Sequence, residues 1–287
     1  MSGSVLAEKK IAIVGLGLMG GSLALALRGQ CQELLALEND LETLAYAKNH
    51  QIVDLISSQP EEILPQADVI ILAAPVGTIL DLIPLLPQWH AGSPLVMDMG
   101  STKVQICDRL NGLPERFHAV GGHPMCGKES SSIRQADGNL FKEAPFALCA
   151  LPSTRNADRQ LAEAIVTGVG ASVLWIDAQT HDIWVAATSH VPYLIANALA
   201  AVVPNDAKLL AGPGLRSTSR LAGSNIQMMT DILMTNRKAV LNQLDIYQKQ
   251  LNSLRGLLLS QSRELLIDEL TDGRNKYLDI ATIKERQ

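Results

Sequence analysis

A histidine at position 123 stands in a setting that suits chemistry better than core packing. In the stretch AVGGHPMCGKE it follows two glycines and precedes Pro124, where a short apolar run ends. Glycines let the backbone pass close to another group, and proline ends a strand because it lacks a backbone N–H. A neutral imidazole can accept a hydroxyl proton as hydride leaves the same carbon. His123 is therefore a candidate general base, and we expect the glycines to clear space for a substrate and cofactor beside it. The alternative is a histidine that only fills the core.

A second polar group follows another apolar run. Ser101 stands in PLVMDMGSTK, where a predicted strand gives way to a helix. Serine at such a point commonly caps the N-terminus of the helix, and we expect that role in part. If the two strand ends are neighbours, Ser101 can also orient the imidazole of His123 or contact the substrate hydroxyl.

Near the N-terminus, IAIVGLGLMGGSLALAL carries a G-x-G-x-x-G motif at Gly15, Gly17 and Gly20, with Leu18 and Met19 inside it. The motif directly follows an apolar strand and opens a helical segment, which is the context of dinucleotide binding. The first glycine permits the tight turn, the second lets backbone approach a diphosphate, and the third lets helix pack on strand. The diphosphate then meets the free N–H groups of the helix. A glycine-rich turn without a ligand is the alternative.

The second predicted strand ends at Glu38, 21 residues after Gly17. An acid at about this spacing binds the ribose hydroxyls of NAD, and a carboxylate there would repel the 2′-phosphate of NADP. The sequence therefore predicts NAD, with NADP less favoured; the alternative is that Asp40 does this work. Ala74 and Pro75 end a later strand, where small residues leave room for the nicotinamide side of the cofactor.

The elements that must position these groups alternate along the first 177 residues. Short β-rich runs are separated by segments of helical spacing, which is typical of a doubly wound, Rossmann-type parallel sheet covered on both faces. The predicted strands are KIAIVGLG, ELLALEND, DVIILAAP, PLVMDMGS, HAVGGHP, APFALCALP and, at the edge, ASVLWID; helical spacing covers residues 21–27, 41–49, 76–86 and 156–166.

From Ala178 the strand pattern disappears. We expect one long, mostly buried helix capped by Thr180, and an all-helical domain over residues 178–287 after a dinucleotide-binding domain over 1–177. Further on, apolar residues follow a heptad pattern: Val240, Leu244, Tyr247, Leu251, Leu254 and Leu258. This pattern predicts either an internal core stripe or the seam of a homodimer. The dimer is favoured by the small size of the helical domain, about 110 residues.

Composition bounds the possible partners. The 287 residues carry a net charge of −5 with no basic block, so neither nucleic acid nor an anionic membrane is expected as a partner. The longest apolar run, residues 191–203, is short and contains Pro192, so we expect a buried helix and no membrane span. Four cysteines without C-x-x-C spacing and no clustered histidines predict no metal site. A reduced, cytoplasmic setting and no signal peptide are expected.

Taken together, several motifs resemble a known family. GLGLMGGSLALAL, DMGSTK, GGHPMCGKESSS, ATSHVPYLIANAL and LRSTSRLAGSN are similar, in this order, to the prephenate/arogenate dehydrogenases of tyrosine biosynthesis. The resemblance runs from about Lys9 to about Gln261. It implies NAD(P)-dependent oxidative decarboxylation, in which a cyclohexadienol loses hydride from its hydroxyl-bearing carbon and CO2 from the opposite carbon.

The resemblance also implies roles for individual residues. His123 matches the catalytic histidine of the family, and Ser101 the serine beside it. For the dicarboxylate substrate the implied contacts are Arg220, His190, Glu129 and Lys128. The planar guanidinium of Arg220 can hold a carboxylate through two hydrogen bonds. A surface ion pair for Arg220, a core position for His190 and a solvated Lys128 are the alternatives.

Three other functions compete with a prephenate dehydrogenase. An arogenate dehydrogenase would act on an amino instead of a keto side chain and give tyrosine directly. A β-hydroxyacid dehydrogenase also begins with GLGxMG, but it uses a lysine in a G-x-x-G-x-x-x-K pattern that does not follow residue 160 here. A regulator that binds the cofactor without turnover would leave no reason for a histidine, a serine and an arginine to converge. The resemblance therefore implies an NAD-dependent prephenate or arogenate dehydrogenase. We expect prephenate as the substrate, although the sequence does not separate it from arogenate.

Overall fold

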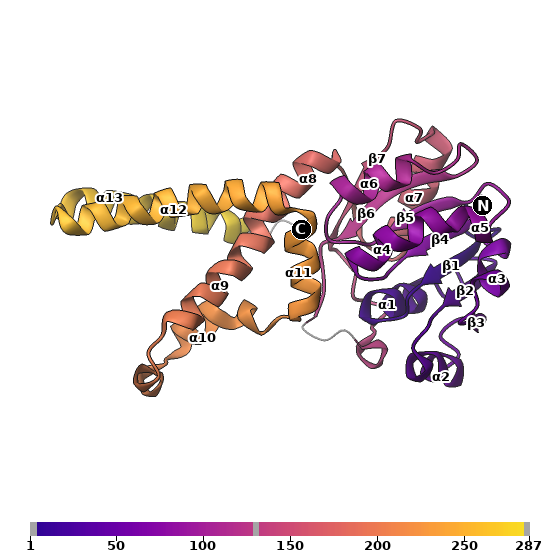
Figure 1. The fold of residues 1–287 in the computed structure, drawn as a ribbon, viewed down its shortest axis with the longest axis horizontal. Coiled ribbons are helices and arrows are strands. Elements are labelled where there is room, and N and C mark those ends of the chain that lie inside the picture. Colours follow the sequence, from indigo (N-terminus) through magenta and orange to yellow (C-terminus); the bar gives the residue numbers. More distant parts are fainter. Residues whose placement is uncertain (1–4, 129–131, 284–287) are drawn as a thin grey trace. The chain divides into compact units, whose positions relative to one another are not determined.

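The computed structural model describes residues 5–128 and 132–283 (Figure 1). By compactness the chain divides into two units, Met1–Arg237 and Lys238–Gln287. The first unit contains the sheet and the helices that cover it, and the second contains most of the two last helices.

The first unit is built on an eight-stranded sheet in the order β3-β2-β1-β4-β5-β6-β7-β8. All neighbouring strands pair in parallel except β6 and β7, which are antiparallel. The order reverses between β1 and β4, so the C-terminal ends of these strands form the switch point of a doubly wound fold. The strands are β1 (Lys10–Val14), β2 (Glu33–Leu37), β3 (Leu55–Ser57), β4 (Val69–Leu72), β5 (Leu95–Asp98), β6 (His118–Pro124), β7 (Pro145–Ala150) and β8 (Ser172–Trp175).

All seven predicted strands are confirmed, and β8 lies at the edge as predicted. The short strand β3 was not predicted, because three partly exposed residues carry little apolar signal. The direction of β7 also differs from the expected parallel sheet. Parallel neighbours need a crossover helix, whereas the described part of the β6–β7 connection has only the short 3₁₀ turn η3 (Ile133–Gln135). Since α7 links β7 to β8, those two strands are parallel.

Alternation along the strands sends side chains to two faces, and each face has its own core. Ile11 and Ile13 of β1 pack with α1 and α7, while Ala12 and Val14 pack with α4 and α6. The helices around the sheet are α1 (Leu18–Leu27), α2 (Leu41–Asn49), α3 (Pro60–Ile63), α4 (Val76–Leu82), α5 (Leu86–Trp89), α6 (Val104–Asn111) and α7 (Asn156–Gly168), with 3₁₀ turns η1 (Leu64–Gln66) and η2 (Ile83–Leu85).

The described elements after β8 are helical, as predicted. They are α8 (Ala178–Val185), the π-helical turn η4 (Ala186–His190), α9 (Val191–Val202), η5 (Asp206–Leu210), α10 (Pro213–Ser219), η6 (Arg220–Gly223) and α11 (Ile226–Thr235). Tyr193, Met229 and Ile232 join the core on the α4 side of the sheet, so this segment packs with the first unit. The predicted domain boundary at Asp177 marks the change from strands to helices and stays a prediction.

The expected long helix is confirmed in outline, with two differences. Its N-cap is Asp177, whose carboxylate accepts a hydrogen bond from the backbone N–H of Thr180 at 2.9 Å, so the predicted cap at Thr180 is wrong. The helix also widens into η4 just before Pro192. Proline cannot donate the backbone hydrogen bond that a regular helix requires, and the π turn accommodates its missing N–H.

The stretch Ala178–Val202 is long and apolar enough to cross a membrane by length and composition, and a third of its most apolar window is buried. Three polar side chains argue for a core helix. His181, Asp182 and His190 are buried and form hydrogen bonds within the first unit. A buried helix is the interpretation that accounts for these contacts.

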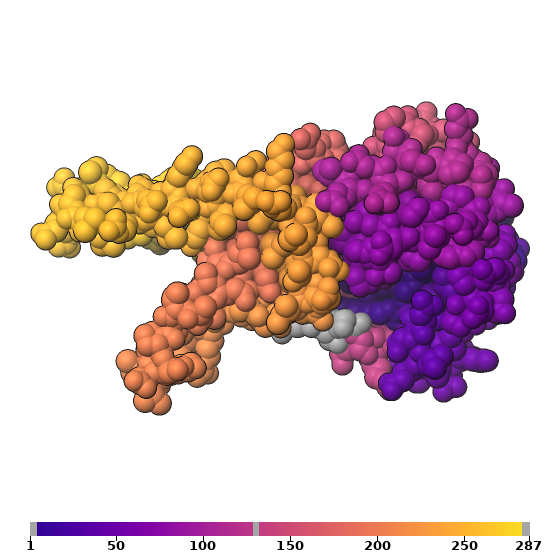
Figure 2. Space-filling view, in the orientation of Figure 1, coloured from indigo at the N-terminus to yellow at the C-terminus, as the bar shows by residue number. Residues whose placement is uncertain are grey.

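The second unit is a pair of long helices, whose atoms Figure 2 draws in gold (α12) and yellow (α13). They are α12 (Arg237–Leu259) and α13 (Arg263–Ile283), and the side chains of Gln250 and Glu269 are hydrogen-bonded between them. The heptad residues of α12 do fall on one helix, and Leu251 and Leu258 are exposed. Large apolar side chains are also exposed along α13: Leu265, Ile267, Leu270, Tyr277, Leu278 and Ile280.

Candidate active site

The glycine motif occupies the turn between β1 and α1. Gly15 has a φ of +93°, which favours glycine, and a Cβ there would lie 2.9 Å from the carbonyl oxygen of Ala73. A Cβ on Gly20 would lie 1.9 Å from the carbonyl oxygen of Gly15, so only glycine lets the helix start this close to the strand. Gly17 is the N-cap of α1 and supplies no side-chain cap. The first-turn N–H groups, which include those of Leu18 and Met19, thus have no capping side chain and suit an anion.

The carboxylate of Glu38 lies beside this turn. Its Oε2 accepts a hydrogen bond from the N–H of Leu16 at 2.7 Å, and its Oε1 accepts one from the N–H of Asp40 at 2.8 Å. Asp40 has a different task, because its side chain caps α2 by accepting from the N–H of Thr43. The geometry therefore favours Glu38 over Asp40 as the acid that meets a ribose, and that role stays a prediction.

Two further residues of the expected cofactor site lie just past β4. Ala74 is partly buried against the core on the α4 side, and Pro75 is the N-cap of α4. The Gly15 contact with Ala73 sets this turn directly against the glycine turn, across the point where the strand order reverses. The turns after β1 and β4 thus lie at the place where a doubly wound sheet binds its ligand.

His123 lies at the end of β6, and its imidazole contacts a second histidine. Nδ1 of His123 is 2.8 Å from Nε2 of His181 in α8, and the two ring centroids are 5.1 Å apart in an edge-on arrangement. Nδ1 of His181 is in turn 2.8 Å from Oδ1 of Asp182. These two hydrogen bonds could not be predicted from the sequence, because position 181 carries no signal that separates it from any buried histidine.

Asp182 also caps the N-terminus of the neighbouring helix α6. Its two carboxylate oxygens accept hydrogen bonds from the backbone N–H groups of Lys103 at 2.7 Å and Val104 at 2.9 Å. The predicted capping role of Ser101 is therefore wrong: α6 begins at Val104, and a carboxylate from another helix binds its free N–H groups. Ser101 lies in the turn between β5 and α6 and is partly exposed.

A buried ion pair holds the ends of β5 and β6 together. Lys103 and Asp98 form a salt bridge, and both side chains are fully buried. The ammonium also donates to the carbonyl oxygen of Gly122 at 2.6 Å, and Asp98 accepts from the N–H of Gly122 at 3.0 Å. A buried charge is tolerated only with such compensation.

The same contacts correct the expected purpose of the two glycines before His123. A Cβ on Gly122 would lie 2.4 Å from the carbonyl oxygen of Asp98, and a Cβ on Gly121 would lie 2.7 Å from Sγ of Cys107. Protein atoms fill the space that side chains would need. The glycines therefore let β6 approach β5 and α6, and do not clear space for a ligand. The strand ends at Pro124, as predicted.

Burial keeps His123 neutral. The imidazole is densely surrounded but still reaches solvent, and desolvation holds its pKa well below the usual value of 6.5. Electrostatic interactions with His181, Lys103 and His190 lower the pKa further. A histidine in this state can accept a proton throughout the neutral range.

His190 is fully enclosed in the π turn. Its Nδ1 lies 3.2 Å from Nδ2 of Asn236, which also donates to the carbonyl oxygen of Asp182 at 2.7 Å. Burial lowers the pKa of His190 to about 4, so this ring is neutral as well. The predicted substrate contact of His190 and the alternative, a satisfied core histidine, are both compatible with these bonds.

The cations expected to bind substrate lie on other segments. Arg220 begins η6, which packs along α9, and its side chain is exposed. Lys128 is exposed and lies 3.5 Å from Oδ2 of Asp137, which fits the solvated alternative. Glu129 lies outside the described residues. The roles of all three stay predictions.

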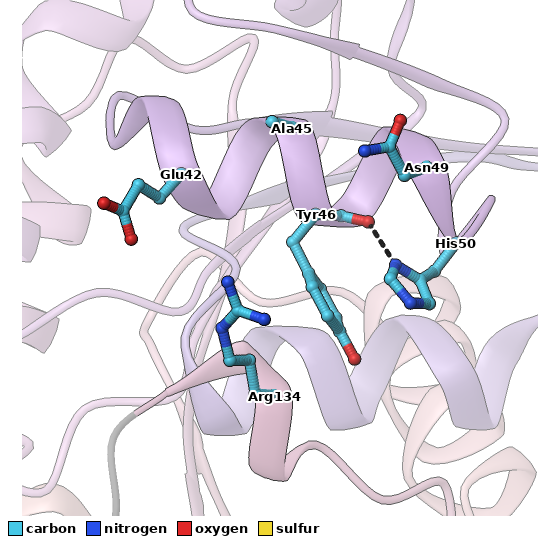
Figure 3. Close-up of a pocket in the computed structure, with 6 residues that line it drawn as sticks. All are labelled: Glu42, Ala45, Tyr46, Asn49, His50 and Arg134. Atoms are coloured by element: carbon cyan, nitrogen blue, oxygen red, sulfur yellow. Dashed lines mark hydrogen bonds between the residues drawn. The ribbon is translucent and has the colours of Figure 1, made fainter.

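A shallow pocket of about 450 Å³ lies elsewhere, between α2 and η3 (Figure 3). Tyr46 stacks on His50 at a centroid distance of 3.9 Å, and the guanidinium of Arg134 lies 4.9 Å from the Tyr46 ring. Since its aromatic and cationic groups already contact one another, we assign this pocket no part in the chemistry. Over residues 5–128 and 132–283, no three His, Cys, Asp or Glu side chains could together hold a metal ion.

Comparison with protein families gives two matches along the chain. A model described as prephenate dehydrogenase, nucleotide-binding domain, matches residues 23–175. A model described as prephenate dehydrogenase, dimerization domain, matches residues 177–272.

Individual proteins agree with these matches. The prephenate dehydrogenase of Lactococcus lactis is 31% identical over 258 residues, which are 86% of this chain and 70% of that protein. The crystal structure of prephenate dehydrogenase from A. aeolicus with hydroxyphenyl propionate and NAD+ superposes with a TM-score of 0.89 at 27% identity, covering 96% of this chain and 99% of that one. Synechocystis arogenate dehydrogenase reaches a TM-score of 0.82 at 29% identity, covering 93% and 99%.

The position of Glu38 predicts the choice of dinucleotide. Glu38→Ala removes a charged hydrogen-bond acceptor, so the KM for NAD should rise about 10- to 100-fold. The ratio of the KM for NADP to the KM for NAD should therefore fall. Initial rates with both dinucleotides measure the ratio. Asp40→Ala is the matched control: it should cost about 1 kcal/mol of stability as a lost helix cap and keep the preference for NAD. If Asp40→Ala shifts the preference and Glu38→Ala does not, Asp40 is the ribose acid.

Proposed function

Because this chain belongs to the prephenate dehydrogenase family, we propose that it oxidises and decarboxylates prephenate with His123 as the general base. The protein is an NAD-dependent dehydrogenase of tyrosine biosynthesis, and its product is 4-hydroxyphenylpyruvate. The observation that carries the assignment of His123 is a neutral imidazole at the end of β6, held by His181 at 2.8 Å.

The reaction needs one base and one hydride acceptor. The C–H bond at the hydroxyl-bearing carbon breaks with both electrons, and NAD supplies the acceptor for this hydride. His123 takes the hydroxyl proton, so the oxygen keeps its electrons and develops a carbonyl. The bond from the opposite ring carbon to the carboxylate then breaks, its electron pair enters the ring, and CO2 leaves as the ring becomes aromatic. The electron pair moves through the ring to the carbonyl oxygen, which takes a proton back from His123 as the phenol forms, so the imidazole is neutral again after each turnover.

The glycine turn supports NAD as the cofactor. The first turn of α1 would receive the diphosphate through the N–H groups near Gly17, Leu18 and Met19, with Gly15 and Gly20 permitting the close approach. Glu38 would accept the ribose hydroxyls. Ala74 and Pro75, after β4, would border the nicotinamide side.

Substrate binding requires cations, because prephenate carries two carboxylates. Arg220 would hold one of them through its planar fork, and the buried, neutral His190 would contribute a hydrogen bond. Glu129 and Lys128 follow β6 and would line the entrance. Ser101, in the turn after β5, would contact the substrate hydroxyl, since Nδ1 of the imidazole already has His181 as its partner.

The C-terminal region matches a dimerization domain, and we propose a homodimer. The apolar surface of α12 and α13 supports this proposal, because a two-helix unit of this size cannot cover such side chains by itself. All four cysteines are free thiols, which supports the cytoplasm as the compartment.

The substrate is tested by measuring NADH formation with prephenate and with arogenate in parallel. We expect kcat/KM to be higher for prephenate, in line with both family models and the L. lactis relative. A higher value for arogenate would make the protein an arogenate dehydrogenase, a possibility that the Synechocystis structure keeps open. Absence of NADH formation with either dienol would overturn the proposed function.

The base is tested by His123→Asn. Loss of the proton acceptor should lower kcat about 10²- to 10⁴-fold while the affinity for NAD stays nearly normal. The wild-type enzyme should keep its activity as the pH falls through 6.5, because the pKa of His123 is held below that value by burial and by His181, Lys103 and His190. Activity should decline only once the pH passes below the lowered pKa. Full activity of the variant would remove His123 from the mechanism.

The anion site is tested by Arg220→Ala. Removing a bidentate carboxylate contact should raise the KM for prephenate about 10- to 100-fold, with a smaller effect on kcat. Arg216→Ala is a control on the preceding helix, α10, and should leave KM within about twofold since exposed charges contribute little. An unchanged KM in Arg220→Ala would mean that another group binds the carboxylate.

A further inference from the structure

We propose that His181 and Asp182 are positioning residues that keep a proton on Nδ1 of His123 and so leave its Nε2 bare to receive the substrate proton. The inference rests on the proposed role of His123 as the base. It concerns which of the two ring nitrogens performs that role and what fixes the choice.

The direction of both hydrogen bonds, from His123 to His181 and from His181 to Asp182, follows from the carboxylate of Asp182. A carboxylate of Asp182 can only accept, so Nδ1 of His181 must carry the proton of the 2.8 Å bond between them. A neutral imidazole with a proton on Nδ1 has a lone pair on Nε2. That lone pair faces Nδ1 of His123 at 2.8 Å, and Nδ1 of His123 must therefore be the donor. The only nitrogen of His123 left without a proton is Nε2.

Asp182 is fixed in this role by its other partners. Its carboxylate accepts the backbone N–H groups of Lys103 and Val104, and its carbonyl oxygen accepts from Asn236. These bonds tie α8 to the N-terminus of α6 and to the end of α11. Because the carboxylate is buried and its contacts come from rigid backbone, rotation of His181 would leave polar groups unsatisfied.

One competing arrangement reverses the last bond. If His181 carried protons on both nitrogens, it would donate to Nδ1 of His123, and the proton of His123 would move to Nε2. The surroundings disfavour that state. A buried imidazolium would have the carboxylate of Asp182 as its counter-charge, and that carboxylate already accepts from two backbone N–H groups.

Nitrogen NMR distinguishes the two arrangements directly. In the full-length protein labelled with ¹⁵N-histidine, long-range proton–nitrogen correlation identifies the protonated nitrogen of each of the six rings at neutral pH. We expect His123, assigned by loss of its signals in His123→Asn, to be protonated on Nδ1 and bare on Nε2. A proton on Nε2 of His123 would overturn the proposal.

Two substitutions at position 181 separate positioning from folding. His181→Leu removes the acceptor, so the His123 proton should redistribute toward Nε2 and kcat should fall about 10²-fold, with the KM for NAD unchanged. His181→Gln places an amide oxygen near the former Nε2 and should restore the Nδ1 proton and most of kcat. Equal kcat in the wild type and His181→Leu, or no rescue by Gln in a folded protein, would contradict the proposal.

His90 provides the matched control. It is also a buried histidine with both ring nitrogens engaged, by Ala67 and Gly92, but it lies between α5 and β5, at the opposite end of the strands from the site. His90→Leu should lower the melting temperature without changing the His123 tautomer or kcat.

The role of His123 as the base and the positioning role of His181 can be disproved separately. A proton on Nδ1 of His123 together with full activity of His123→Asn would remove the proposed base and leave the hydrogen-bond chain without a catalytic purpose. An inactive His123→Asn with an unaffected His181→Leu would keep the base and remove the positioning role.

Discussion

The carboxylate of Asp182 is the contact on which the site depends. It accepts hydrogen bonds from the N–H groups that start α6 and from His181, which holds His123. One buried side chain from the helical segment thus joins the turn after β5 to the histidine at the end of β6. Removing it would leave two backbone N–H groups and Nδ1 of His181 without a partner, at a cost of about 1–3 kcal/mol for each unsatisfied group. The position of the proposed base therefore depends on the packing of α8 against the sheet.

A second constraint on the site is a buried ion pair. The buried pair of Lys103 and Asp98 binds both the N–H and the carbonyl of Gly122, so the ends of β5 and β6 are fixed relative to each other. Lys103 also places a positive charge near His123 and lowers its pKa, which keeps the ring able to accept a proton. Burying such a pair costs desolvation energy that apolar side chains would not cost. In return, the pair fixes the strand that carries the base, and its lysine lowers the pKa of His123.

Much of this architecture could be predicted from the sequence, because apolar periodicity marks strands and helices wherever burial is strong. The glycine turn, Glu38 and the end of β6 at Pro124 followed from local rules of backbone geometry. The predictions that were wrong concern residues whose contacts come from distant segments of the chain. Ser101 was expected to cap α6, yet Asp182, 81 residues further along, binds its N-terminus. The glycines before His123 were expected to face a ligand, yet they face Asp98 and Cys107. APFALCA indicated a strand but not its direction, and nothing local joins His181 to His123.

The most direct test of this account is a crystal structure of the enzyme with NAD and a phenolic substrate analogue such as hydroxyphenyl propionate. We predict that Nε2 of His123 lies within hydrogen-bond distance of the ring hydroxyl, with C4 of the nicotinamide facing the carbon that bears it and His181 still bound to Nδ1. An analogue bound with its hydroxyl away from His123, or an imidazole turned so that Nδ1 faces the ring, would contradict it.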